Sequence, residues 1–438
     1  MIKLFLMLEK EQHLGMVGLI LITIFLTADQ AALVPNYLLV EAEFGISHAQ
    51  IGAISSVFIV VGALAVLLWG WWVDKYSRKK LLVMGTLLGE IPCFLTAFAQ
   101  NYTQLFITRA LTGLGIGVIL PVGSSLLGDY FPPRERGKGF AWFSFAIGLG
   151  YLLGAVIAGM IGPKFSWRYP FVIAAVPNFI LIFLFYLFVK EPKRGEAEPE
   201  LKKLLKTDAI YNYKVRFSDF KKVVNIRTNL FLNLQSIVGC VPWGILPIWV
   251  ITFFVQEKGF TIPGATTLAL AFGGAKMVGN LYGGYLGDYL NKKGSTQRIV
   301  LCIATILLAI PFIAVSIAYP IPSHPEFSHI LIPLFLGFIG ISISSVAGPN
   351  SRAIFLDVNV PENRGIMLSI ANLTDVIGAG IGPLMGGILG DIYGLGFVFY
   401  ISILFWIPCA LLWIPLIRTI PWDIDNLSRI MRKRVLEV

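Results

Sequence analysis

The chain has 438 residues, of which 56% are hydrophobic and only 14% carry a charge. Soluble domains carry about 25% charged residues, so the composition excludes a string of soluble domains and indicates a protein embedded in the lipid bilayer. The formal net charge of +10 does not indicate a nucleic-acid partner, because the cations lie between long apolar runs and form no basic domain. The four cysteines lie inside apolar runs without metal-ligand spacing, so we expect no disulfide framework, metal or cofactor.

Twelve stretches are predicted to cross the bilayer as helices, since a span needs about 20 mostly apolar residues. In chain order they are 14–40, 48–72, 80–99, 103–128, 139–162, 168–189, 230–255, 262–286, 297–319, 329–356, 366–390 and 395–418. If the chain changes sides at each span, 29 of its 35 Lys and Arg residues lie on the side of the two termini. The positive-inside rule then predicts a multi-pass protein of the cell membrane whose termini are both cytoplasmic.

The two halves of the chain resemble each other. The segment from Gly70 resembles the segment from Gly284 at an offset of 214 residues, and the segment from Asp129 resembles the one from Asp357 at an offset of 228. Six spans return the chain to its starting side, so the halves are parallel repeats. The predicted fold class is an all-α membrane protein with twelve transmembrane helices in two parallel-repeat six-helix bundles.

A polar, cationic stretch separates the two halves. Its apolar residues are spaced to allow short amphipathic helices at the inner membrane interface. The chain is therefore expected to have four parts, which are an N-terminal six-helix bundle at 1–189, a cytoplasmic amphipathic linker at 190–229, a C-terminal six-helix bundle at 230–418 and a basic cytoplasmic tail at 419–438.

Several motifs connect the chain to a known family. The loop after the second span reads Gly70-Trp-Trp-Val-Asp74-Lys-Tyr-Ser-Arg78, and the fourth span contains Arg109-Ala-Leu-Thr-Gly-Leu-Gly. With these motifs the chain resembles the major facilitator superfamily, and with Asp29 and the Gly-Asp-Tyr-Phe-Pro-Pro segment at 128–133 it is similar to the spinster-like and proton-coupled drug-exporter branches. The resemblance implies a transporter that works by rocker-switch alternating access, usually as a monomer.

Six ionisable side chains lie at membrane depth, where a charge is costly unless it has a partner or a water-filled cavity. They are Asp29, Glu90, Arg109, Lys276, Arg352 and Asp375. Asp29 and Arg109 are predicted to pair, and breaking the pair would change the proton affinity of Asp29. We therefore expect Asp29 to accept a coupling proton, with a static structural pair as the alternative. Glu90 joins the proton-coupling candidates, although a structural partner is the simpler interpretation of it.

The second half carries another predicted pair, Lys276 and Asp375, which lie at equal depth in their spans. This pair either holds the half together or leaves Lys276 to meet an anionic substrate group. Arg352 either joins that site or extends its charged head to the lipid headgroups. The predicted substrate site combines these three residues with Asp29 and Arg109. Aromatic residues that either line its cavity or pack the helices are Tyr37, Trp142, Phe145 and Trp243.

The repeated loops are predicted to form a cytoplasmic gate. A carboxylate in such a loop can accept hydrogen bonds from the free N–H groups at the start of a helix in the opposite half. The predicted gate residues are Gly70, Asp74, Arg78, Asp129 and Arg136 in the first half and Gly284, Asp288, Lys292, Asp357 and Arg364 in the second.

Three function classes follow. The leading interpretation is a proton-coupled secondary transporter of a small organic or amphipathic molecule, lipids and drug-like molecules included. The alternative is an organic-anion symporter or facilitator, in which Arg109, Lys276 and Arg352 form a cationic central site and Asp29 is structural. A membrane-embedded receptor or enzyme is the third class. The sequence has no nucleophile and base constellation, metal-ligand cluster or phosphate-binding loop that would favour an enzyme.

Overall fold

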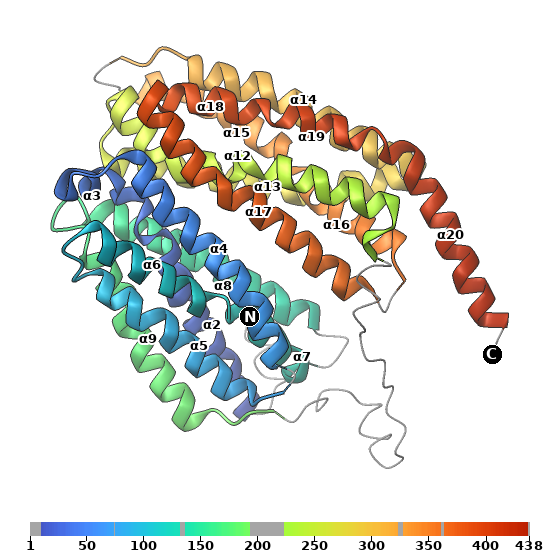
Figure 1. Ribbon diagram of the computed structural model, residues 1–438, viewed down its shortest axis with the longest axis horizontal. Coiled ribbons are helices and arrows are strands. Elements are labelled where there is room, and N and C mark those ends of the chain that lie inside the picture. Colours follow the sequence, from blue (N-terminus) through green and yellow to red (C-terminus); the bar gives the residue numbers. More distant parts are fainter. Residues whose placement is uncertain are drawn as a thin grey trace. The chain divides into compact units, whose positions relative to one another are not determined.

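The computed structural model describes residues 10–73, 75–131, 136–192, 223–322, 327–360 and 363–436 (Figure 1). These residues form helices and short connections, without strands. The contacts within the chain divide it into two compact units, Met1–Asn212 (unit 1) and Tyr213–Val438 (unit 2). The linker predicted at 190–229 lies mostly outside the described residues.

Unit 1 contains helices whose axes run roughly alongside one another, coloured blue to green in Figure 1. Pro35 lies in a short 3-10 turn that separates the first long helix from its continuation, because proline cannot supply the N–H of a regular helix. The helices are α2 (Lys10–Ala32), η1 (Val34–Asn36), α3 (Tyr37–Phe44), α4 (His48–Val73), α5 (Arg78–Thr96), α6 (Tyr102–Ile116), α7 (Ile119–Tyr130), α8 (Arg136–Ile161) and α9 (Tyr169–Phe188).

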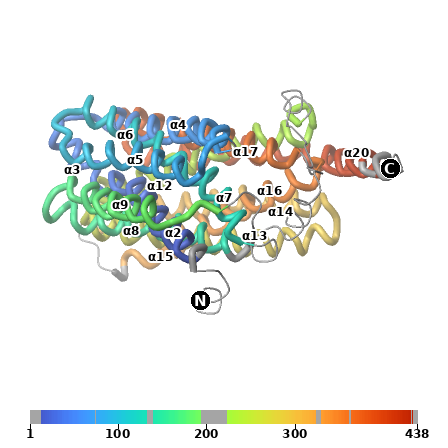
Figure 2. Tube along the Cα trace, turned by 90° about the horizontal axis from the view of Figure 1, so that it is seen from below, coloured from blue at the N-terminus to red at the C-terminus, as the bar shows by residue number. Residues whose placement is uncertain are grey.

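Unit 2 is built in the same manner and ends in an additional helix. Its elements are α12 (Arg227–Lys258), α13 (Ile262–Asn291), α14 (Ser295–Ala318), α15 (Phe327–Ser345), α16 (Ala347–Val358), α17 (Arg364–Tyr393), α18 (Leu395–Leu404), α19 (Trp406–Trp413) and α20 (Leu416–Leu436). Figure 2 shows that α20 extends past the end of α14, on which its first part packs. Asp423 of α20 is buried and accepts a hydrogen bond from the backbone N–H of Thr228, which fixes the start of α20 to α12.

The membrane character predicted from the sequence is confirmed. Ten helical segments of the described residues are long and apolar enough to cross a membrane. The two predicted spans that are not among them, 80–99 and 262–286, coincide with α5 and α13. Both helices have a less apolar composition, since α5 begins with three cations and contains Glu90, while α13 contains Lys276 and many glycines. All twelve predicted spans therefore correspond to helices.

Glycines set the spacing of the helices that carry charges in unit 1. A Cβ atom added at Gly154 of α8 would lie 2.0 Å from the carbonyl oxygen of Ala28, so α8 approaches α2 directly beside Asp29. A Cβ atom at Gly115 of α6 would lie 2.1 Å from the nitrogen of Gly89, so α6 approaches α5 directly beside Glu90. Small residues permit such close contacts between membrane helices. Asp29 and Glu90 of unit 1 consequently lie beside close contacts between helix backbones, α2 with α8 and α5 with α6.

Candidate functional site

The first charged site is a buried ion pair between α2 and α6. Arg109 donates from Nη1 to Asp29 Oδ1 at 2.6 Å and from Nη2 to the Asp29 carbonyl oxygen at 3.3 Å. The side chains are 0% (Asp29) and 2% (Arg109) exposed. The ring centroids of Phe58 and Phe171 lie 4.7 and 5.3 Å from the guanidinium carbon. The pairing predicted from the sequence is present, and its role in proton coupling stays a prediction.

Two further helices complete this site. Asn178 of α9 donates from Nδ2 to Glu90 Oε1 at 2.6 Å and to the carbonyl oxygen of Ile22 at 3.4 Å. Cys93, one turn after Glu90 on α5, is buried and donates from Sγ to the carbonyl oxygen of Phe171 at 3.8 Å. Asn178 was not among the predicted site residues. It is the one amide side chain in the apolar stretch 168–189, and this polarity is the signal that could have identified it.

Two carboxyl oxygen atoms of this site accept no hydrogen bond from the described residues. Asp29 Oδ2 and Glu90 Oε2 are both buried and have no hydrogen-bond partner among the described residues. A carboxylate oxygen without a donor can take a proton, and a proton on Asp29 would weaken its attraction to Arg109. The geometry is compatible with the predicted proton coupling, which stays a prediction.

The charges of unit 2 form a different and more accessible arrangement. Arg352 of α16 pairs through Nη2 with Asp375 Oδ2 of α17, and both side chains are 33% exposed. The predicted pairing of Asp375 with Lys276 is therefore wrong. Of the two alternatives for Arg352, the structure shows an ion pair with a residue of the predicted site, and its position relative to the headgroups stays a prediction. Equal depth does not decide which helix faces meet: α16 packs against α17, while α13 packs mainly against α12, α14, α15 and α16.

Lys276 lies over an aromatic ring. Its Nζ is 4.3 Å from the centroid of Trp243 on α12, and no carboxylate in the described part of the chain lies within ion-pair distance of it. The side chain of Lys276 is exposed. An accessible ammonium beside an indole ring is suited to a ligand with an anionic group and a flat apolar part.

The other predicted aromatic residues differ in accessibility. Tyr37 is buried, and its hydroxyl hydrogen-bonds the hydroxyl of Ser55, so it packs the interior of unit 1 and does not line a surface. Trp142 and Phe145 form an edge-to-face pair on α8 with ring centroids 5.7 Å apart. Phe145 is exposed, so it remains available to a ligand, a lipid or another helix.

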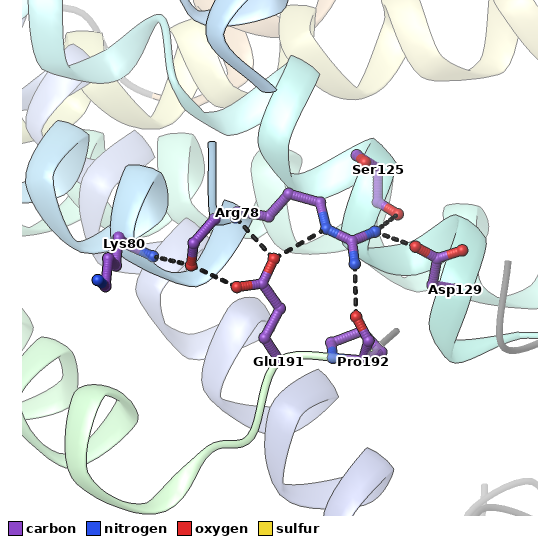
Figure 3. Close-up of polar contacts among 7 residues, drawn as sticks. Arg78, Lys80, Ser125, Asp129, Glu191 and Pro192 are labelled. Atoms are coloured by element: carbon purple, nitrogen blue, oxygen red, sulfur yellow. Dashed lines mark hydrogen bonds and ion pairs between the residues drawn. The ribbon is translucent and has the colours of Figure 1, made fainter. Parts of the chain in front are cut away.

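A second type of charged site lies at the end of α7 and the start of α5, and Figure 3 shows its contacts. The buried guanidinium of Arg78 pairs with Asp129, donates from Nε to Glu191 Oε1 at 3.2 Å and donates from Nη2 to the Pro192 carbonyl oxygen at 2.5 Å. The hydroxyl of Ser77 also donates to Glu191. We call these five residues the Arg78 cluster, and it joins α5, α7 and the chain after α9.

Glu191 was missed by the sequence analysis. Its signal is an acidic residue directly after the sixth predicted span. Burial raises the pKa of Glu191, but the hydrogen bonds from Ser77 and Arg78 and the charge of Arg78 outweigh this effect and hold the pKa below its ordinary value. The carboxylate is therefore the favoured form at neutral pH.

Unit 2 has a corresponding cluster around Arg298, in the first turn of α14. Arg298 donates from Nη2 to Asp288 Oδ1 at 2.6 Å and from Nη1 to Asp357 Oδ2 at 3.1 Å. We call these three residues the Arg298 cluster. The sequence offset had matched Arg78 with Lys292, and this match is wrong. Lys292 follows the end of α13 and is exposed, whereas Arg298 is buried and makes the contacts.

The remaining predicted gate residues have fewer contacts. Arg364 donates from Nε to the Leu356 carbonyl oxygen at 3.1 Å. No atom lies within 4 Å of a Cβ added at Gly284, and Gly70 shows only an ordinary contact, so tight packing explains neither glycine. Asp74 and the side chain of Arg136 lie outside the described residues. The gating roles stay predictions.

Comparison with known proteins gives consistent results. A sequence model of the Major Facilitator Superfamily matches residues 19–348. The cis,cis-muconate transport protein of Acinetobacter baylyi is 23% identical over 368 residues, which are 82% of this chain and 83% of that protein. The probable 4-methylmuconolactone transporter of Cupriavidus pinatubonensis is 27% identical over 352 residues, 77% of this chain and 74% of that protein.

A solved structure shares the fold. It is a bacterial homolog of the human lysosomal transporter Spinster in an inward-facing and unoccupied conformation, with a TM-score of 0.81 and 17% sequence identity. The match covers 95% of this chain and 98% of that one. The same helical architecture therefore extends over nearly the whole length of both chains.

Proposed function

Because the chain belongs to the Major Facilitator Superfamily, we propose that it is a proton-coupled secondary transporter of a small organic solute. Membership makes it a multi-pass membrane transporter and not an enzyme. The proposal places it in the cell membrane, with both termini in the cytoplasm, working as a monomer by alternating access. Its partners are then the solute, the coupling proton and the bilayer.

The observation that carries proton coupling is the buried ion pair of Asp29 and Arg109. Removing one partner of a buried pair leaves an uncompensated charge at a high free-energy cost. A proton on Asp29 has the same consequence for Arg109, which then favours a conformation in which its guanidinium meets water or an anion. Proton binding and conformational change are thereby linked.

The solute class follows from the relatives and from unit 2. The two relatives above are named for the transport of muconate, an organic acid, and of methylmuconolactone. In unit 2, Lys276 lies over Trp243 and has no carboxylate partner among the described residues, which supports an anionic, partly flat solute. Amphipathic lipids and drug-like molecules are the alternative solute class, and the substrate screen described below includes them.

A second candidate function is organic-anion symport or facilitation in which Asp29 is only structural. The accessible Lys276 and Arg352 favour it, because they supply cations without any need for a proton site in unit 1. The two functions differ in one property. Uptake by a facilitator does not depend on a pH gradient, whereas proton-coupled uptake does.

A binding screen of organic acids, sugar acids and lipids first identifies a solute. The test is then uptake of this solute into proteoliposomes with and without an imposed pH gradient. We expect the gradient to stimulate uptake by the wild type. Asp29→Asn should abolish this stimulation while solute exchange in the absence of a gradient persists. Asp425→Asn, a change at an exposed carboxylate on α20, is the matched control. Full pH stimulation in Asp29→Asn would overturn the proposed coupling role.

A further inference from the structure

Glu90 lies in the buried cluster that also contains Asp29, Arg109 and Asn178, but it has no counter-ion among the described residues. Its side chain is completely buried, and the described residues place no Lys or Arg nitrogen within ion-pair distance of its carboxyl group. Among the described residues, the one hydrogen bond that it receives comes from the neutral amide of Asn178. The nearest cation, Arg109, is already bound to Asp29 by two contacts.

The polar and charged groups near Glu90 come from α2, α6, α9 and α5 itself. Asp29 belongs to α2, Arg109 to α6, Asn178 to α9 and Cys93 to α5 itself. Two carboxyl groups and one guanidinium carry a net charge of −1 if both carboxyls are ionised. A protein interior stabilises an unpaired carboxylate poorly, and such a group neutralises by binding a proton instead.

The hydrogen bonds of the cluster point the same way. Asp29 Oδ2, Glu90 Oε2 and Asn178 Oδ1 are all buried, and none has a partner among the described residues. All three are acceptors when both carboxyls are ionised, so the cluster has more acceptors than donors. A proton on Glu90 converts one of these acceptors into a donor.

We propose that Glu90 holds a resident proton, so that Asp29, Arg109 and Glu90 together form a neutral site with one anion, one cation and one carboxylic acid. This inference deepens the proposed function and rests on it for its transport readout. Glu90 is then a second proton-binding position that does not exchange during transport. The cluster couples one proton, bound by Asp29, and not two.

The direct test is infrared spectroscopy of the full-length protein in liposomes at neutral pH. A protonated carboxylic acid has a carbonyl stretching band that a carboxylate lacks. We expect this band in the wild type, and we expect its loss in Glu90→Gln. A wild type without the band, or a band that is unchanged in Glu90→Gln, would overturn the proposal. Should Glu90→Gln not fold, Glu90→Asp replaces it: the shorter acid has different hydrogen bonds, so its band should shift, and an unshifted band would overturn the proposal.

The pH dependence of uptake provides a second test. Glutamine is neutral, as protonated Glu90 is, so the pH midpoint of uptake in Glu90→Gln should equal that of the wild type. If Glu90 were ionised, its replacement would remove a negative charge from the cluster and move the midpoint of uptake to lower pH. Such a fall would contradict the resident proton.

The two proposals can fail separately. Loss of the infrared band in Glu90→Gln together with pH-stimulated uptake in Asp29→Asn would refute the coupling role and retain the protonated Glu90. Absence of the band in the wild type together with loss of pH stimulation in Asp29→Asn would refute the protonated Glu90 and retain the coupling role of Asp29. Glu41→Gln, a change in the same unit at a carboxylate near the end of α3, serves as the control for both measurements.

Discussion

The two units bury their charges to different degrees. The membrane-depth pair of unit 1 is 0% and 2% exposed, whereas the pair of unit 2 is 33% exposed at both residues. The clusters around Arg78 and Arg298 repeat this difference. The two carboxylates that bind Arg78 are 13% and 25% exposed, and those that bind Arg298 are 45% and 75% exposed. The carboxylates paired with these arginines are therefore more buried in unit 1 than in unit 2.

The surroundings of Arg109 show how its pair is kept from water. In unit 1 the guanidinium of Arg109 lies between two phenylalanine rings, and glycines bring four backbones together around it. A buried ion pair depends strongly on both partners, because the loss of one leaves an uncompensated charge. An ion pair that is one-third exposed is screened by water and contributes little to stability. The units are therefore expected to respond differently to equivalent substitutions.

The largest expected effect comes from removing the arginine of each pair. Arg109→Gln should destabilise the protein by about 3–5 kcal/mol, since Asp29 then lies buried without a counter-ion. Arg352→Gln should cost at most about 1 kcal/mol, because water can solvate Asp375. Unfolding of the purified protein in detergent measures both. Equal losses in the two variants would contradict the contrast between the units.

A double substitution sharpens this result. Asp29→Asn combined with Arg109→Gln removes both charges and should be clearly more stable than Arg109→Gln alone, with a coupling energy within the range of about 0.5–3 kcal/mol found for residues in contact. The corresponding pair of changes at Arg352 and Asp375 should be nearly additive.

A smaller effect is expected at Lys276, on solute affinity and not on stability. Lys276→Met keeps the aliphatic stem over Trp243 and removes the charge, so we expect KM for an anionic solute to rise about tenfold, or about 1.4 kcal/mol, with unfolding unchanged. Lys293→Met is the matched control, because Lys293 also lies over an aromatic ring, with its Nζ 4.7 Å from the centroid of Tyr289. A rise in KM for a neutral solute of the same size would indicate a packing defect instead.

Depth along a helix could be predicted from the sequence, but the direction in which a side chain points could not. Asp29 and Arg109 were correctly paired, because few charged groups are available in the first half and a long guanidinium can bridge a difference in depth. The second half offers two cations for Asp375, and depth alone favoured Lys276. The structure pairs Asp375 with Arg352, since the choice depends on which faces of α16 and α17 meet.

The repeat had a similar limit. It predicted the two halves and the carboxylates Asp129 and Asp357, which do bind an arginine in each unit. Matching by offset assigned Lys292 as the equivalent of Arg78, although Arg298 makes the contacts. An arginine can occupy a different sequence position in each repeat and still bind the equivalent carboxylate, because the start of its helix is shifted as well. Side-chain equivalence therefore required coordinates.

The smallest expected effect concerns the pH dependence of stability, which should differ between the Arg78 cluster and the Arg298 cluster. The hydrogen bonds of Ser77 and Arg78 hold the pKa of Glu191 below its ordinary value despite burial, so ionised Glu191 stabilises the folded state. This stabilisation is fully present above the unfolded pKa of about 4.3 and is lost as the pH falls through the lower folded pKa. Thermal unfolding of the wild type and of Glu191→Gln in detergent should differ by on the order of 1 kcal/mol at neutral pH.

This difference should close as the buffer is acidified through that window, because protonated Glu191 and glutamine are both neutral. Asp288→Asn is the comparison in unit 2, where the carboxylate is 75% exposed, and it should change stability less than Glu191→Gln at neutral pH. A difference between wild type and Glu191→Gln that persists in acid would mean that packing, and not charge, stabilises the Arg78 cluster. An equal effect of Asp288→Asn would show that the burial of the carboxylates does not control the strength of these clusters.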